Sequence, residues 1–437
     1  MTDPSASFHP TLPGDLPPLR PTLVRGEGVY VWDVDGHRYL DAISGTFCVQ
    51  LGYGREDLAR AMAEAASRIP FARPRAFDSE ESEAYAREIL EAAGAPYTRV
   101  LFTSSGSEAV EAALKAAYVY QRAIGREGRT RYTRLKGHFH GSTLQALAAT
   151  DVRARRAPYE ALLSGGSPAV DPLDGHALED SVRSSFALLA ETIPGAGLGV
   201  ALPPPGLLQR MRSACDDVDA LWIADEVLTG FWRTGRMFAW QRLSEGATPD
   251  IVVFGKGAGC GYAPLAGILI KDRVADVLEG APGGRFGHAQ TYGGHAIGCA
   301  VGRRVLAAMS EEKIPDRVRS LEQPLGSSLE ALTGHELVRE VRGVGFLWGI
   351  LLRADRGTGA PFDRKLRVAE RVEARCREQG LLVFSGSGSA DGEHGDHLLV
   401  GPPLVAEPHH FVQIASGIRR VLDEILREKR PSGPSPR

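Results

Sequence analysis

The chain has 437 residues, of which 43% are hydrophobic and 24% are charged. These proportions are ordinary for a soluble globular protein and exclude a disordered or fibrous chain, and the length allows more than one domain. The formal net charge is −3 and there is no long basic run, so a nucleic-acid or anionic-membrane partner has no electrostatic support. Small molecules are the expected ligands.

The five cysteines are widely spaced and include no C-x-x-C pair, which argues against a disulfide framework or a zinc site. We therefore expect no metal and a reducing compartment. The first 21 residues contain six prolines and lack the basic and apolar regions of a secretory signal, which predicts an extended arm and a cytoplasmic protein. The cysteines are Cys48, Cys215, Cys260, Cys299 and Cys376.

The first predicted element is a β-hairpin over residues 28–45, which alternate apolar and polar side chains around Asp35-Gly36. Asp-Gly pairs supply the positive φ angles of a tight turn. Apolar residues at helical spacing predict helices over 56–69 and 79–93. Strands and helices then alternate, which predicts a mostly parallel sheet wrapped by helices, with ligand groups at the carboxyl ends of the strands. The expected strands are 99–103, 131–137, 186–193, 220–227, 251–254 and 266–270, and the helices between them include 107–122 and 205–215.

The pattern changes near residue 316. A strand over 345–352, a helix over 364–380 and strands over 381–384 and 397–401 predict a smaller α+β domain. The expected division is an arm and hairpin segment (1–65) that joins the small domain, a large ligand-binding domain (66–315) and a C-terminal small domain (316–437).

Residues 251–270, IVVFGKGAGCGYAPLAGILI, carry a single charge, on Lys256. A membrane span would tolerate a central lysine poorly, and two buried strands joined by a glycine-rich loop fit the pattern better. On that loop Lys256 is either a surface side chain with a solvated amine or a lysine that forms a Schiff base with a ligand aldehyde. The second alternative removes the cost of burying the charge.

The segment LFTSSGSEAVEAALKAAY, residues 101–118, has the pattern of a strand, a loop of small residues and a helix. The free amides of the first helical turn form a potential phosphate site, where Gly106 allows close approach and Ser107 adds a hydroxyl. Alternatively, Ser105 or Ser107 caps the helix and Glu108 interacts favourably with its dipole.

Two further candidates follow strands. Asp225 ends an apolar run, where an unpaired carboxylate is costly, so it needs a strong donor such as a protonated pyridine nitrogen. Its structural alternative is an ion pair with Arg233 or Arg236. In KGHFHGST, Phe139 beside His140 is suited to stacking on a flat ligand ring, unless both belong to the core.

The order of these four signals is informative. A phosphate loop, a ring-stacking aromatic residue, an acid for a ring nitrogen and a lysine for an aldehyde are what pyridoxal 5'-phosphate (PLP) requires. The sequence therefore predicts a PLP enzyme.

These motifs resemble a known family, the class III (ω-) aminotransferases of PLP-dependent fold type I. The similarity covers about residues 27–404 and rests on SGSEAVEAALKAA, HFHGST, IADEVLTGFWRTG, PDIVVFGKGAGCGYAPLAG and HAQTYGGHAIGCA. The stretch FCVQLGYGRE is most similar to the amine:pyruvate branch. The resemblance implies an α/β protein with a large, mostly parallel sheet and a smaller α+β domain built from the N-terminal and C-terminal regions.

The resemblance also implies roles for individual residues. Thr291 would reach the phosphate of the neighbouring subunit, which implies a homodimer with shared active sites. The resemblance implies that Gly106 and Ser107, beside Ser105, hold the phosphate of PLP. Phe139, next to His140, and Val227 would lie against the two faces of its ring. Asp225 would pair with the pyridine nitrogen, and Lys256 would form the aldimine.

Several positions depart from the family pattern. Phe139 replaces a common tyrosine, Trp232 a glycine and Thr192 a proline. Ala196 stands where ornithine- and GABA-type members carry a glutamate, so these substrates are not expected. Phe47 and Trp232 are the candidates for the substrate pocket.

The implied reaction moves an amino group from an amine donor to a carbonyl acceptor through the Lys256 aldimine and a pyridoxamine intermediate. A PLP-dependent decarboxylase or aminomutase of the same fold remains an alternative. A non-catalytic PLP-fold binding protein is another, although the intact Lys256 and Asp225 argue against it.

The C-terminal region bears on the substrate. Residues 378–418 contain no arginine or lysine, and Leu399 stands where ornithine-type members place an arginine for a substrate carboxylate. We therefore expect at least one substrate without a carboxylate next to its reacting carbon, unless another cation, such as Arg25 or one from the partner subunit, replaces the missing one.

Overall fold

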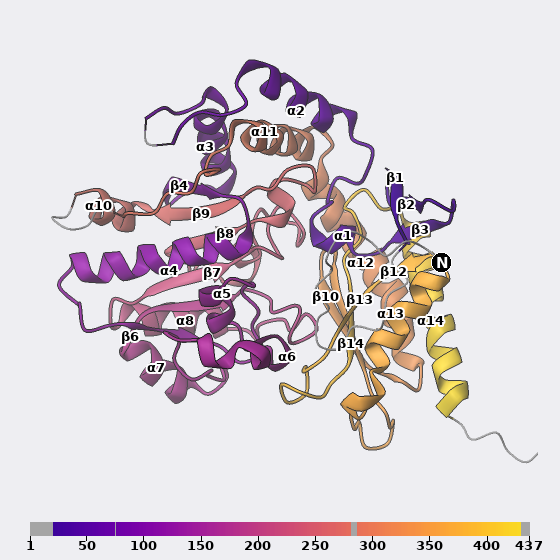
Figure 1. Cartoon of the computed structure of the whole chain (residues 1–437). Helices are drawn as coiled ribbons and strands as arrows, with labels where there is room; N and C mark the ends of the chain where they lie inside the picture. Colours follow the sequence, from indigo (N-terminus) through magenta and orange to yellow (C-terminus); the bar gives the residue numbers. More distant parts are fainter. Residues whose placement is uncertain (1–20, 75, 281–285, 430–437) are drawn as a thin grey trace, which may run out of the picture.

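The computed structural model describes residues 21–74, 76–280 and 286–429, whose strands form three β-sheets (Figure 1). The largest sheet has the strand order β4-β9-β8-β7-β6-β5. Only β9 runs antiparallel to its neighbours, so the sheet is mostly parallel, as the alternating sequence pattern predicts. Its strands are β4 (Tyr97–Thr103), β5 (Arg131–Arg134), β6 (Ser185–Glu191), β7 (Leu221–Asp225), β8 (Ile251–Phe254) and β9 (Ala266–Lys271).

Helices cover both faces of this sheet (Figure 1). In β8, Ile251 and Val253 pack in the core cluster that contains α4, whereas Val252 and Phe254 pack with Tyr85 of α3. Strands buried on both faces explain the continuous apolar runs of the sequence. The longer helices here are α2 (Glu56–Arg68), α3 (Glu80–Ala93), α4 (Gly106–Ala123), α7 (Gly175–Arg183), α8 (Leu207–Asp216), α10 (Asp272–Gly280) and α11 (Ala296–Glu311), and the short ones are α1 (Ser44–Phe47), α5 (Leu144–Ala149), α6 (Arg153–Arg156) and α9 (Trp240–Leu243).

Two four-stranded sheets form the second part of the molecule, in the orders β1-β2-β3-β12 and β10-β11-β14-β13. Parallel pairing of β12 with β3 joins the N-terminal hairpin to the C-terminal region. The elements are β1 (Leu23–Glu27), β2 (Tyr30–Asp33), β3 (Arg38–Asp41), β10 (Val338–Val344), β11 (Leu347–Leu352), β12 (Leu381–Leu382), β13 (Phe384–Gly386), β14 (His397–Val400), α12 (Ile314–Glu330), α13 (Val368–Glu378) and α14 (Pro408–Lys429).

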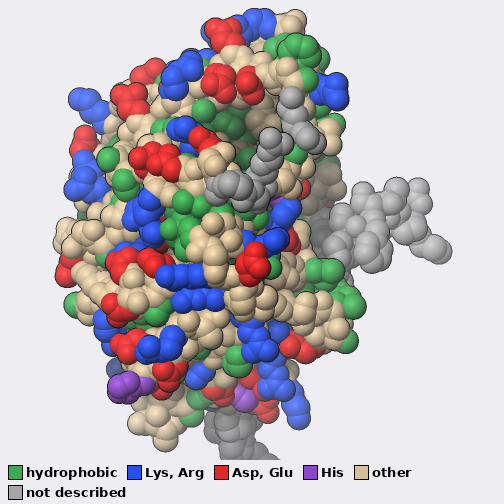
Figure 2. Space-filling view, turned by 90° about the vertical axis from the view of Figure 1, so that its left-hand side faces the viewer, with side chains coloured by type: hydrophobic (Ala, Val, Ile, Leu, Met, Phe, Trp, Pro, Cys, Tyr) green, Lys and Arg blue, Asp and Glu red, His purple; other side chains and the backbone are tan. Residues whose placement is uncertain are grey.

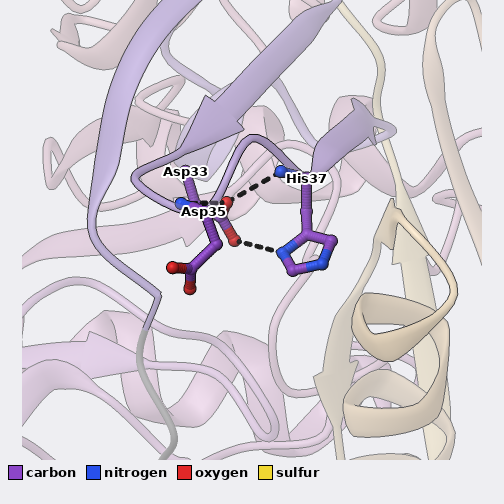
Figure 3. A group of neighbouring side chains, drawn as sticks. All are labelled: Asp33, Asp35 and His37. Atoms are coloured by element: carbon purple, nitrogen blue, oxygen red, sulfur yellow. Dashed lines mark hydrogen bonds and ion pairs between the residues drawn. The ribbon is translucent and has the colours of Figure 1, made fainter.

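The turn of the predicted hairpin is organised by Asp33 (Figure 3). Its carboxylate accepts hydrogen bonds from the amides of Asp35 (3.0 Å) and His37 (2.9 Å) and from Tyr39 Oη (2.7 Å). Of the expected Asp-Gly pair, only Gly36 has a positive φ, of 81°. Asp33, Asp35 and His37 lie near one another, but the Asp35 carboxylate points away from the other two side chains, so the cluster is a turn motif.

Three C-terminal expectations need correction. Strand β10 was not predicted, because the charges in VREVRGV interrupt its apolar pattern and it lies at a sheet edge. The helix expected over 364–380 begins only at Val368, since Arg367 has a φ of 50°. The strand expected over 381–384 is two short strands, β12 and β13, in different sheets.

The described residues contain no helix long and apolar enough to cross a membrane. On the face in Figure 2, basic and acidic side chains are interspersed, in agreement with the small net charge. The boundaries expected after residues 65 and 315 stay predictions, although the turn between α11 and α12, at residues 312–313, lies near the second.

Candidate active site

A cavity of about 410 Å³ lies at the carboxyl ends of the parallel strands. It is lined by segments that follow β4, β5 and β8 and by the ends of β6 and β7. This is where ligands bind in open α/β sheets. Of the residues predicted from the sequence, the cavity brings together Phe47, Ser105, Gly106, Ser107, Phe139, His140, Asp225, Val227 and Lys256.

The N-terminus of α4 opens into this cavity. Ser105 caps the helix by accepting a hydrogen bond from the Glu108 amide (3.3 Å), and Ser107 Oγ accepts one from the Ser142 amide (3.0 Å). A Cβ atom at Gly106 would lie 2.9 Å from Val227 Cγ1, so only glycine leaves room there. The amides of the first turn have no acceptor within the helix, which suits an anionic group.

Asp225 lies at the end of β7 and is 5% exposed. Its Oδ2 accepts a hydrogen bond from His140 Nδ1 (2.7 Å), and its Oδ1 accepts one from the Val227 amide (3.1 Å). The alternative ion pair with Arg233 is not formed, because that guanidinium donates to the Pro402 carbonyl (2.6 Å) and to Ser44 Oγ (2.9 Å). Each carboxylate oxygen has two acceptor sites, so Asp225 retains capacity for a ligand donor.

Glu191, at the end of β6, was not among the predicted site residues. Its Oε2 accepts a hydrogen bond from the Phe139 amide (2.7 Å), so it positions the loop that carries this ring. Burial and the neighbouring Asp225 charge raise the pKa of Glu191 to about 8. Glu191, like Asp225, is an acid that ends a buried strand, so the same sequence signal could have identified it.

Lys256 follows β8, and its backbone has a positive φ of 41°. This conformation costs a non-glycine residue about 1–3 kcal/mol, and such strain is concentrated at functional sites. Burial lowers the pKa of the Lys256 amine, while the charges of Asp225 and Glu191 oppose that shift. A lowered pKa increases the fraction of neutral, nucleophilic amine.

The remaining wall of the cavity is mostly apolar. Phe47 and Phe384 meet edge to face at 6.0 Å between ring centroids. Leu228, Leu399 and Ala196 also line this wall.

One cation of this wall, Arg155 of α6, was missed by the sequence analysis. Its guanidinium carbon lies 5.8 Å from the centroid of the Phe139 ring. Arg25, the expected replacement, instead pairs with Glu27 and stacks on Trp32. Nothing in the local sequence distinguishes Arg155 from the neighbouring arginines.

Two predicted site residues do not line the cavity. Thr291 is exposed in the turn before α11. Trp232 lines a separate depression beside α2, α3 and α11.

The family model of the class III aminotransferases matches residues 15–422. The chain belongs to this family. It is 35% identical to an uncharacterised aminotransferase of Bacillus subtilis over 87% of each chain, and 30% identical to the putrescine–pyruvate aminotransferase of Pseudomonas aeruginosa, covering 92% of this chain and 90% of that one. The fold matches the ω-transaminase of Pseudomonas jessenii in complex with PMP with a TM-score of 0.85 and 28% identity, over 95% of this chain and 94% of that one.

As a class III aminotransferase, the protein is a PLP-dependent transaminase. The cavity fits this cofactor. The amides and serine hydroxyls at the N-terminus of α4 line one part of it. The buried carboxylate of Asp225, at the end of β7, and the Lys256 amine, whose pKa is lowered, also line it. His140 Nε2 is also buried there without a hydrogen-bond partner.

Proposed function

We propose that this aminotransferase exchanges an amino group between a small amine and a carbonyl compound, at least one of which lacks a carboxylate next to its reacting carbon. The apolar wall of the cavity carries this proposal, because Leu399 lines it where ornithine-type relatives place an arginine. The name of the Pseudomonas aeruginosa relative, a putrescine–pyruvate aminotransferase, supports an amine donor without a carboxylate.

Bound PLP supplies an aldehyde that receives the amino group and a ring that stabilises the electron pair released at the substrate carbon. The α4 amides, with Ser105 and Ser107, bind its phosphate. Phe139 and Val227 hold the ring from opposite faces. Glu191 orients Phe139 through its amide.

Asp225 and Lys256 perform the proton chemistry in this proposal. Asp225 keeps the pyridine nitrogen protonated, and His140 orients the Asp225 carboxylate through the bond of 2.7 Å. Lys256 anchors the cofactor. In its free form, the Lys256 amine would carry the proton that moves during amino transfer.

A homodimer with shared sites is part of the proposal. Next to Thr291, the apolar rings of Phe71, Phe77 and Tyr292 are 43%, 71% and 59% exposed, and Phe71 contacts Tyr292 at 6.2 Å between ring centroids. A second subunit would cover these rings. Mixing Lys256→Ala with Thr291→Ala subunits should then restore activity, because one site of each heterodimer has neither defect. No recovery after proven subunit exchange would place Thr291 in its own subunit's site.

We also propose a reducing, cytoplasmic compartment. All five cysteines lie among the described residues and are free thiols, which supports this location.

Absorbance spectra of the purified holoenzyme with single amines added test the donor class. We expect carboxylate-free amines to convert the cofactor to its amino form faster than simple α-amino acids do. A panel in which every α-amino acid is more than about tenfold faster than every carboxylate-free amine would contradict the proposal.

A further inference from the structure

A further cavity lies at the start of α13, apart from the active site. Its volume is about 870 Å³, and it is lined by residues 361–365 and 393–394 together with Arg367 and with Ala154 of α6. It shares no lining residue with the active-site cavity. A ligand bound here would therefore leave the cofactor position free.

Arg367 of this cavity has no acidic partner among the described residues. Its neighbour Arg364 is paired, since its Nη1 donates to Glu370 Oε2 (3.0 Å). Arg367 is partly exposed, and its Nε and Nη2 atoms are buried with no hydrogen-bond partner. Its Nη1 also lacks a partner in the part of the chain that the structure describes, and it is the guanidinium nitrogen left open to a ligand.

This arrangement favours a counter-ion. Burial has removed water from two of the three nitrogens that share the Arg367 charge, and no acceptor among the described residues replaces it. An anion beside Nη1 would therefore stabilise this side chain more than it would stabilise a fully hydrated surface arginine.

The other charges of the cavity define the ligand. The Lys365 side chain is exposed, and its amine has no acidic partner within residues 21–74, 76–280 and 286–429. Asp363 Oδ1 accepts a hydrogen bond from the Lys365 amide (2.9 Å), which leaves Oδ2 as an acceptor. Glu393, the other acid that lines the cavity, is paired with Arg153 at 2.7 Å. The cavity thus offers two unpaired cations and an acceptor for a hydroxyl group.

We propose that this cavity binds a small phosphate monoester that also carries hydroxyl groups, such as a sugar phosphate. The phosphate dianion lies between Arg367 and Lys365, whose two charges it balances, and a hydroxyl group donates to Asp363. A single carboxylate would leave one of the two cations unpaired. The volume of about 870 Å³ accommodates a carbon skeleton as well as the phosphate.

Calorimetry at constant ionic strength tests this assignment, with glycerol 3-phosphate as the probe and with holoenzyme, in which the cofactor occupies the active site. We expect Arg367→Leu to weaken binding by about tenfold or more and Lys365→Leu by about two- to fivefold. Arg367→Lys should recover part of the loss. Because Lys365 is exposed, its variant should fold even if Arg367→Leu does not. The control Arg420→Leu, at an exposed residue of α14 outside the cavity, should behave as wild type.

Comparison ligands test the ligand class in the wild type. Glycerol, which lacks the phosphate, and succinate, a dianion without hydroxyl groups, should each bind more weakly than glycerol 3-phosphate by about tenfold or more. Undetectable binding of glycerol 3-phosphate, or equal binding to the wild type and to either leucine variant, would overturn the assignment. Inorganic phosphate or succinate that binds as tightly as glycerol 3-phosphate would also overturn it, because the carbon skeleton and its hydroxyl groups would then not be recognised.

Discussion

The two walls of the active-site cavity are built differently. The wall at the strand ends consists of polar groups fixed by hydrogen bonds, such as the pair of Asp225 and His140 at 2.7 Å. The other wall consists of apolar side chains, including Phe47 and Phe384, which come from segments far apart in the chain and meet edge to face. Displacing a buried polar group leaves its partner unsatisfied, whereas apolar contacts adapt more readily. We therefore expect the polar wall to fix the chemistry and the apolar wall to set the choice of substrate.

Lys256→Ala should have the largest effect, because it removes both the cofactor anchor and the proton carrier from the polar wall. We expect turnover to fall by about four decades or more. Borohydride reduction followed by mass spectrometry should find cofactor attached to the wild-type chain and none attached to the active-site peptide of the variant. A reducible adduct at the same site in the variant would show that another lysine carries the cofactor.

Asp225→Asn should come second. The amide oxygen can still accept the bond from His140 Nδ1, so the fold should persist, but a neutral amide cannot hold a pyridine nitrogen protonated. We expect turnover to fall by about two to four decades. Asp216→Asn, which changes an exposed helix carboxylate, is the control and should leave the rate unchanged. A near-normal rate in Asp225→Asn would make this carboxylate purely structural.

The same contrast explains what could be predicted from the sequence. Asp225 is the last residue of one buried strand and Lys256 follows the next, and parallel strands place their carboxyl ends at one edge, so local patterns and strand order suffice to bring them together. The cavity contains both, although their roles stay predictions.

The apolar wall depends on contacts between distant segments. Phe384 lies where the chain crosses from one small sheet to another at residue 383, and the sequence shows only one apolar run there. Arg155 occurs in the run RARR, in which three arginines are locally equivalent and only tertiary structure separates the one at the cavity. Trp232, chosen for its departure from the family pattern, lies at another depression instead.

Phe384→Ala tests the apolar wall directly. Removing this ring frees space beside Phe47, so rates with bulky amines should rise relative to small ones by on the order of tenfold. The dissociation constant of PLP, measured by fluorescence titration, should change by no more than about twofold. Leu366→Ala, at a residue that is 52% exposed, is the control. If PLP affinity falls as much as the substrate ratio changes, the two walls are not independent.

A last expected effect concerns the pH dependence of stability, without a change in the reaction itself, and comes from Glu191. The pKa of Glu191 is raised to about 8 in the folded chain, mainly by burial and then by the Asp225 charge. A raised pKa means that the folded chain binds this proton more tightly than the unfolded chain. Stability from this group is therefore complete below the ordinary glutamate pKa and is lost as the pH rises toward 8.

Glu191→Gln resembles the protonated acid at every pH, so its midpoint of thermal unfolding should depend less on pH across that window. Wild-type apoenzyme should lose on the order of a few kcal/mol more than the variant between about pH 5 and pH 8. The exposed Glu245→Gln should retain the wild-type slope. A protonated ring nitrogen beside Asp225 would offset the negative charge that helps to raise the Glu191 pKa. Adding PLP should therefore reduce the dependence of wild-type stability on pH. The pH dependence of Glu191→Gln should stay nearly the same. A wild-type slope that steepens on adding PLP would mean that the cofactor ring does not neutralise this part of the polar wall.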